Sequence, residues 1–90
     1  MNILEAKLLR DKGKSLMGRN DLEFEIIDVI VIPRTHTSDF FAEYRNYFNS
    51  ISNDDMIEKY LSKEYFVQVI YHIGTDIGGE DIETYKNLIS

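Results

Sequence analysis

The sequence has no cysteine, no tryptophan and a single proline among its 90 residues. Without cysteine the chain can form no disulfide, no thiolate nucleophile and no cysteine-ligated zinc site. Its longest unbroken apolar run, residues 29–32, is far too short to span a bilayer. The first apolar residues are followed at once by Glu5 and Lys7, so the core of a signal peptide is missing. We therefore expect a soluble, cytoplasmic protein that does not associate with membranes.

Basic residues are also scarce. The chain has 10 Lys and Arg against 16 Asp and Glu, which gives a net charge of −6 at pH 7. Residues 1–20 hold five bases and two acids, whereas residues 21–90 hold five bases and fourteen acids. A field of this sign repels the backbone of nucleic acids and favours basic partners. We expect a basic protein as the partner and no direct binding to nucleic acid.

What is present is enough apolar material for one core. Hydrophobic residues make up 43% of the chain, and six Tyr and five Phe are among them. This content is typical of globular domains, and 90 residues fit one small domain. Residues 1–90 are therefore expected to form a single domain.

The spacing of the apolar residues predicts four helices and two strong strands. Helices are expected over 2–12 (with Ile3, Leu4, Leu8 and Leu9 as its apolar stripe), from about Asp39 to Ile51, over 54–63 after an Asn53 cap, and over 80–89. Strands are expected over 22–32, where Pro33 ends the ladder, and over 65–73.

The order of these segments predicts the fold class. Residues 18–21 combine Gly, Asn and Asp between two apolar runs, which predicts a β-hairpin there. The connection from Pro33 to Lys63 is long enough for a right-handed helical crossover, which would set the two strong strands parallel. We expect an α+β fold: a small three-stranded sheet, a hairpin plus one strand reached by a helical crossover, packed by three to four helices.

Asp28 stands out because it lies inside an apolar strand. A buried carboxylate is costly unless it is paired or protonated, and such a group can serve as a tuned acid or base. Strict alternation places Asp28 on the same face as Ile26 and Ile30. A β-bulge near Ile26–Ile27 would instead turn it outward, and we favour either this bulge or a position on an edge strand over a buried carboxylate.

The segment from Pro33 to Asp39 has two interpretations. Thr37, Ser38 and Asp39 are residue types that accept hydrogen bonds from the first amides of a helix, so simple capping explains them. A helix start beyond the end of a strand can also bind an anion. The candidate ligand residues are then Arg34, Thr35, His36, Thr37 and Ser38, although the carboxylate of Asp39 opposes this interpretation.

No complete set of catalytic or metal-binding residues is recognisable. His36 and His72 are the only histidines, and neither belongs to a local metal-binding spacing. Gly13-Lys14-Ser15 lacks the earlier glycine of a phosphate-binding loop. We therefore expect no metal, no cofactor and no catalytic residue.

The aromatic and acidic residues suggest a docking surface. Tyrosine is enriched at protein interfaces, and acidic neighbours would attract a basic protein. The candidate residues for partner binding are Tyr44, Tyr47, Glu80, Asp81 and Glu83.

These features together favour a non-enzymatic function. The leading hypothesis is a small acidic interaction module that binds and regulates or inhibits another macromolecule, with homo-oligomerisation as an option. Phage inhibitors, antitoxins and immunity proteins are of this size and charge. This comparison is an analogy with a class of proteins and not with a particular family. One alternative is a protein that binds a small anionic ligand or nucleotide at the Pro33–Asp39 helix start. Another is a small enzyme that uses Asp28 or His72.

Overall fold

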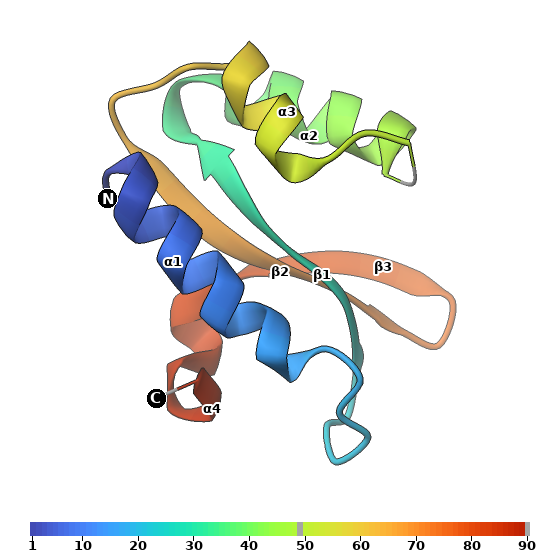
Figure 1. Cartoon of the computed structure of the whole chain (residues 1–90). Helices are drawn as coiled ribbons and strands as arrows, with labels where there is room; N and C mark the ends of the chain where they lie inside the picture. The colour runs from blue at the N-terminus through green and yellow to red at the C-terminus, as the bar shows by residue number, and fades with distance from the viewer. Residues whose placement is uncertain (49, 90) are drawn as a thin grey trace.

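Three strands form one antiparallel sheet in the order β1–β2–β3 (Figure 1). The computed structural model describes residues 1–48 and 50–89, with the side chains of 1–48 and 50–87. The strands are β1 (Glu25–Pro33), β2 (Tyr65–Ile73) and β3 (Asp76–Asp81). The α-helices are α1 (Ile3–Gly13), α2 (Thr37–Tyr47), α3 (Asn53–Lys59) and the single turn α4 (Lys86–Ile89), and short 3₁₀ segments cover Lys14–Leu16, Arg34–His36 and Ile82–Tyr85. The predicted α+β class is confirmed.

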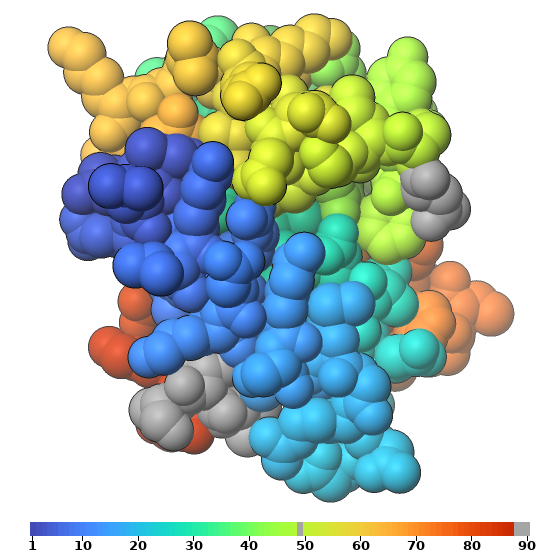
Figure 2. Space-filling model, viewed as in Figure 1, coloured from blue at the N-terminus to red at the C-terminus, as the bar shows by residue number. Residues whose placement is uncertain are grey.

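Helix α1 crosses one face of the sheet, in front of β1 and β2, and α3 lies along the outer edge of β1 (Figure 1). Helix α2 packs on the opposite face, beside β1. In Figure 2 the side chains of α1 (blue) and α3 (yellow) meet and hide most of the sheet behind them. The core between these layers is apolar and includes Leu16, Ile30, Ile32, Phe40, Met56, Val67, Val69 and Ile82.

Helix α1 forms where the sequence predicts it, but it buries a different side. Asn2 caps it by accepting a hydrogen bond from the Glu5 amide. Leu4 and Leu8 are 73% and 68% exposed, and the buried residues are Ala6, Arg10 and Gly13. Small residues such as Ala6 and Gly13 face the sheet because the helix lies close to it: a Cβ on Gly13 would be 2.9 Å from Val29 Cγ1 of β1. The predicted apolar stripe is therefore wrong for Leu4 and Leu8.

The predicted hairpin around residues 18–21 is wrong. Residues 14–16 form a 3₁₀ turn and residues 17–24 are turns and bends, although Gly18, with a φ of 83°, does make a turn. Only Leu16 and Met17 are apolar before the turn, too few for a strand to pair. The hairpin of this fold joins β2 to β3 through Gly74 and Thr75.

The prediction that the two strong strands run parallel is also wrong. β1 and β2 are antiparallel, with Val29 paired to Val69 and Pro33 paired to Tyr65. Helices α2 and α3 contact each other, so the chain goes out along one helix and returns along the other. This helical connection brings the chain back to the end of the sheet that it left, and an antiparallel strand follows.

The helix predicted over 80–89 is wrong for most of its length. Residues 76–81 form β3, and α-helix is limited to Lys86–Ile89. The third helix ends at Lys59 and is capped by Ser52, not by Asn53. Asn53 does not cap the helix, and its side chain instead forms hydrogen bonds at the edge of β1.

Candidate functional site

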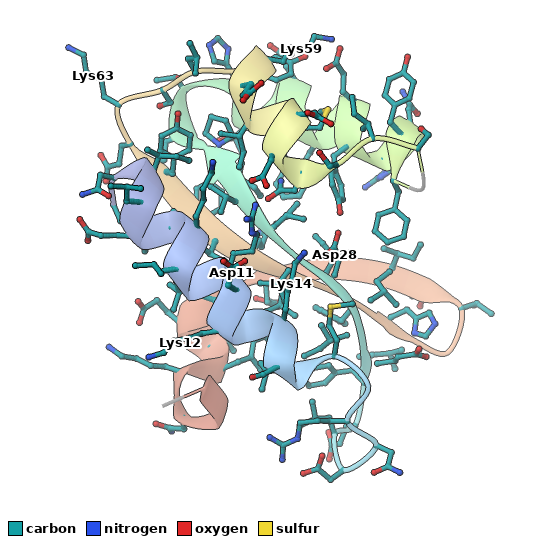
Figure 3. All side chains as sticks on the ribbon, in the orientation of Figure 1. Asp11, Lys12, Lys14, Asp28, Lys59 and Lys63 are labelled. Atoms are coloured by element: carbon teal, nitrogen blue, oxygen red, sulfur yellow. The ribbon has the colours of Figure 1, made fainter. Side chains whose placement is uncertain are left out.

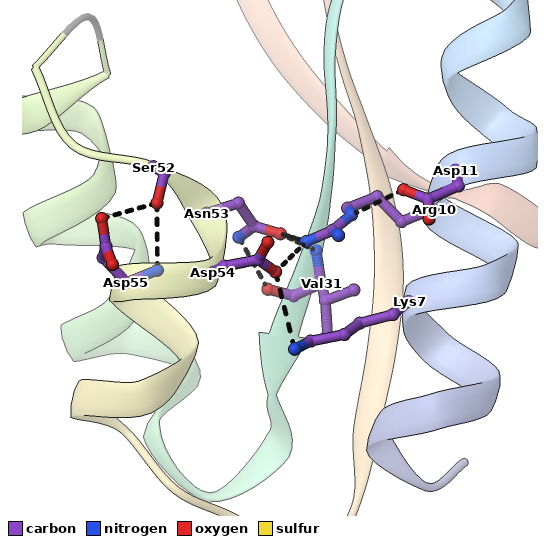
Figure 4. A network of polar contacts seen from close by, with 8 residues as sticks. All are labelled: Lys7, Arg10, Asp11, Val31, Ser52, Asn53, Asp54 and Asp55. Carbon is purple, nitrogen blue, oxygen red and sulfur yellow. Dashed lines mark hydrogen bonds and ion pairs between the residues drawn. The ribbon is translucent and has the colours of Figure 1, made fainter.

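The outer edge of β1 is closed by side chains (Figure 4). The Val31 amide donates to Asn53 Oδ1 at 3.0 Å, and Asn53 Nδ2 donates to the Val31 carbonyl at 3.2 Å. The Val29 amide donates to Asp28 Oδ1 at 2.8 Å. Backbone groups of an edge strand that point away from the sheet would otherwise offer a template for another strand. At β1 this template is already occupied.

A buried arginine holds Asn53 in place. Arg10 of α1 is 7% exposed, and its Nη1 donates to Asn53 Oδ1 at 2.9 Å and to Asp54 Oδ1 at 2.7 Å. This hydrogen bond lowers the pKa of Asp54, and the nearby Lys7 ammonium adds to the effect. The network ties α1, α3 and β1 together, as Figure 4 shows. No local sequence pattern predicts it, because Arg10 and Asn53 are 43 residues apart.

The bulge predicted near Ile26–Ile27 is confirmed, since the pairing register of β1 shifts between Ile26 and Asp28. Asp28 nevertheless does not turn fully outward. It is half-buried near the middle of β1 (Figure 3), and its Oδ2 accepts a hydrogen bond from the Tyr44 hydroxyl of α2. Burial raises the pKa of Tyr44 well above its usual range, and the carboxylate of Asp28 raises it further. Asp28 therefore holds α2 against the sheet through Tyr44 and provides a partner for a backbone amide at the edge of β1.

The Tyr44 contact predicts a dependence of stability on alkaline pH. Because the folded-state pKa of Tyr44 lies above the unfolded value of about 10, its contribution is fully present below pH 10 and is lost as the pH rises further. The free energy of unfolding should fall above about pH 10, and it should fall less steeply in Tyr44→Phe. Urea denaturation at a series of pH values measures both slopes.

Tyr60 supplies the control for this experiment. Its hydrogen bond to Glu43 raises the pKa of Tyr60 to about 12, so Tyr60→Phe removes a separate alkaline contribution. Identical slopes for the wild type and Tyr44→Phe would show that the Asp28–Tyr44 contact does not act as described.

The outer edge of β3 differs from that of β1. A two-residue turn joins Ile73 to Asp76, and the residues that flank such a turn form a hydrogen-bonded pair. Hydrogen-bonded pairs alternate along the ladder, so Gly78 and Glu80 also bond to β2, whereas the backbone groups of Ile77 and Gly79 point outward. Within residues 1–48 and 50–89, no helix or strand flanks this edge (Figure 1). No described side chain forms a hydrogen bond with its outward groups.

The two faces of β3 carry different side chains. Asp76, Gly78 and Glu80 lie on the face that α1 covers, and Ile77 and Gly79 lie on the other face. Asp76 and Glu80 are exposed and form no ion pair with any described residue. In Figure 3 the labelled Lys59 and Lys63 lie away from β3. Asp76 and Glu80 therefore remain without a cationic partner among the described residues.

Beside β3, on the face opposite α1, lies a groove of about 650 Å³ between the sheet and α2. Its apolar wall consists of Ile27, Phe41, Phe48, Ile70 and Ile77. Ile77 is 70% exposed, and Gln68 Oε1 is buried there without a hydrogen-bond partner among the described residues. An exposed strand edge next to an apolar groove is a surface that a second chain can cover.

The residues predicted at the Pro33–Asp39 corner do not converge. Arg34 lies over the Phe66 ring at 5.2 Å and 3.5 Å from Glu64 Oε1, while the His36 ring contacts the Tyr60 ring at a tilt of 51°. Thr37 Oγ1 donates to the Arg34 carbonyl at 3.0 Å. Thr35 and Ser38 are exposed, and Ser38 lines the groove.

The expected capping of α2 by hydroxyl or carboxylate side chains is wrong. The N-cap position is His36, and it makes no side-chain capping hydrogen bond. The Thr37 hydroxyl is turned back toward carbonyl groups of the preceding 3₁₀ turn, because that turn offers acceptors.

The predicted partner-binding residues are distributed between core and surface. Tyr44 is 4% exposed, so its ring is not available to a partner, whereas Tyr47 is 50% exposed. Glu80 lies on the open edge of β3. Asp81 accepts a hydrogen bond from the Glu83 amide at 3.0 Å, and Glu83 is exposed just beyond the strand.

Sequence reasoning missed the open edge and the groove. The available signal was Gly74-Thr75, a Gly-X pair between Ile73 and Asp76, which fits a two-residue hairpin turn. The paired glycines Gly78 and Gly79 outweighed this signal, because glycine is depleted in strands.

His72 lies near the start of the hairpin, with its Nε2 3.5 Å from Glu25 Oε2. In the part of the chain whose side chains are described, no three His, Asp or Glu residues gather closely enough to hold a metal ion. Among the same residues, no helix has the length and apolar character needed to cross a membrane. Comparisons with models of protein families, with curated proteins and with solved structures found no match for this chain.

Proposed function

We propose that the chain is a non-enzymatic interaction module that binds a basic protein and thereby regulates or inhibits it. The observation that carries the proposal is the edge of β3, where unpaired backbone groups and the free acids Asp76 and Glu80 lie beside an apolar groove. Acidic groups steer a basic partner toward the surface, and buried apolar contacts hold it there. Phage and bacterial inhibitors, antitoxins and immunity proteins are the classes that this mode of action resembles.

Two further observations support a binding role over catalysis. Asp28, the best candidate for a tuned acid, is engaged by the Tyr44 hydroxyl and the Val29 amide. Arg34, the best candidate for an anion ligand, is engaged by Phe66 and Glu64. These groups have structural roles in the fold, whereas Asp76 and Glu80 of β3 form no hydrogen bond or ion pair with a described residue.

Charge reversal at Glu80 tests the proposal. Glu80→Lys should slow association with a basic protein captured from the cells of origin by about threefold to tenfold at low salt, and this difference should shrink at high salt. Surface plasmon resonance with the captured partner measures the rates at both salt concentrations.

The matched control is Glu58→Lys, which makes the same charge change at an exposed position of α3. Its effect on association should be clearly smaller than that of Glu80→Lys. Equal effects of the two variants would mean that net charge, and not the edge of β3, governs the association, and the proposal would fail.

A further inference from the structure

We propose that the edge of β3 accepts one extended segment of the partner as a fourth, antiparallel strand, whose side chains alternate between basic and apolar. This inference rests on the proposed function and specifies the partner's binding segment. It assigns the affinity to main-chain hydrogen bonds and the selectivity to side chains of alternating direction.

The backbone supplies the first part of the argument. The outward amides of Val29 and Val31 in β1 are occupied by Asp28 and Asn53, which opposes the addition of a strand along this part of the edge. The corresponding groups of Ile77 and Gly79 in β3 have no partner among the described residues. The edge of β3 is therefore available for an added strand, whereas this part of the edge of β1 is not.

The side chains supply the second part, because residues directly opposite each other in an antiparallel pair share a face. Residues of the added strand opposite Ile77 and Gly79 would lie on the groove face, where apolar side chains are favoured. A Cβ at Gly79 would be 3.5 Å from Ile70 Cδ1, so a side chain that crosses this glycine reaches the groove wall. The intervening residues would lie beside Asp76 and Glu80, where lysine or arginine is favoured.

A second copy of the chain fits this edge poorly. If Ile77 paired with Gly79 of a second copy, Asp76 would lie opposite Glu80 of that copy. Like charges directly opposite each other destabilise strand pairing. In this register the acidic edge disfavours a second copy and favours a basic strand.

Synthetic peptides of about seven residues, the length of an ordinary strand, test the inference on the full chain. The probe alternates lysine and valine, and a matched control alternates glutamate and valine. Two further probes carry backbone N-methyl groups, on the valines in one and on the lysines in the other. Fluorescence anisotropy measures the affinity of each labelled peptide, and sedimentation measures the mass of the free protein.

In antiparallel pairing, the valines opposite Ile77 and Gly79 are the residues whose amides donate to β3, while the lysine amides point away. N-methylation of the valines should therefore weaken binding by on the order of tenfold, because it removes donors and adds bulk at the pairing edge. N-methylation of the lysines should change the affinity by less than about twofold. The glutamate peptide should not bind measurably.

The other outcomes separate the two proposals. If the lysine peptide binds and N-methylated valines do not weaken it, strand addition is wrong while the acidic surface still binds basic chains. If N-methylation of the lysines, and not of the valines, weakens binding, the proposal that the added strand runs antiparallel to β3 is wrong. If the lysine peptide binds no better than the glutamate peptide, the proposed function fails together with the inference. A stable dimer in the free protein with a protected β3 edge would identify a second copy as the occupant.

Discussion

Asn53→Ala should lower the free energy of unfolding by about 3 kcal/mol, because it leaves two buried groups of Val31 without partners. Asn53 is only 9% exposed and receives a third hydrogen bond from Arg10. An unpaired buried donor or acceptor loses its interaction with water and gains nothing in return. Urea denaturation measures the loss. The effect far exceeds that of an ordinary asparagine because this side chain completes a strand edge.

Asn46→Ala is the matched control, since Asn46 is exposed on α2. It should change stability by less than about 0.5 kcal/mol. A cost for Asn53→Ala that is as small as the control would mean that water replaces the asparagine freely. The outer edge of β1 would then be open, and the distinction between the two edges of the sheet would be lost.

Phe40→Ala should cost about 4 kcal/mol, because it leaves a cavity where α2 meets the sheet. The Phe40 side chain is fully buried, and its ring packs against Tyr44 and Tyr60 at centroid distances of 6.0 and 6.1 Å. Helix α2 forms one wall of the groove beside β3, so this contact also fixes the shape of the groove. Denaturant titration followed by circular dichroism measures the change.

Two further variants make this result interpretable. Tyr47→Ala removes an aromatic ring from the exposed side of the same helix and should cost less than about 1 kcal/mol. Phe40→Leu keeps most of the volume and should cost about 1 kcal/mol, so it remains folded if the alanine variant does not. If Phe40→Ala and Tyr47→Ala were equally mild, α2 would not be anchored through Phe40.

Local sequence patterns predicted the elements that local forces determine. The alternation in 65–73 and the apolar run ended by Pro33 identify β2 and β1, and the cost of burying Asp28 correctly indicated a bulge. The orientation of the two strands was not predictable from the length of their connection. A two-helix connection can return to either end of a sheet, and the packing of α2 on α3 decides which.

The candidate site was less predictable for physical reasons. Gly78 and Gly79 lower intrinsic strand propensity, yet in β3 they pack under Tyr71 and Gln68 of the neighbouring strand. The Arg10–Asn53 contact depends on tertiary structure alone. The basic partner expected from the acidic surplus stays a prediction. The register of β3 shows where Asp76 and Glu80 lie relative to the apolar groove face.

The central claim is that the chain closes the edge of β1 and leaves the edge of β3 open, and amide hydrogen exchange of the free protein tests it most directly. The amides of Gly78, Glu80 and Val31 should be protected, while those of Ile77 and Gly79 should exchange at rates close to those of an unstructured peptide. Protection of Ile77 and Gly79 equal to that of their neighbours, or rapid exchange at Val31, would contradict the claim.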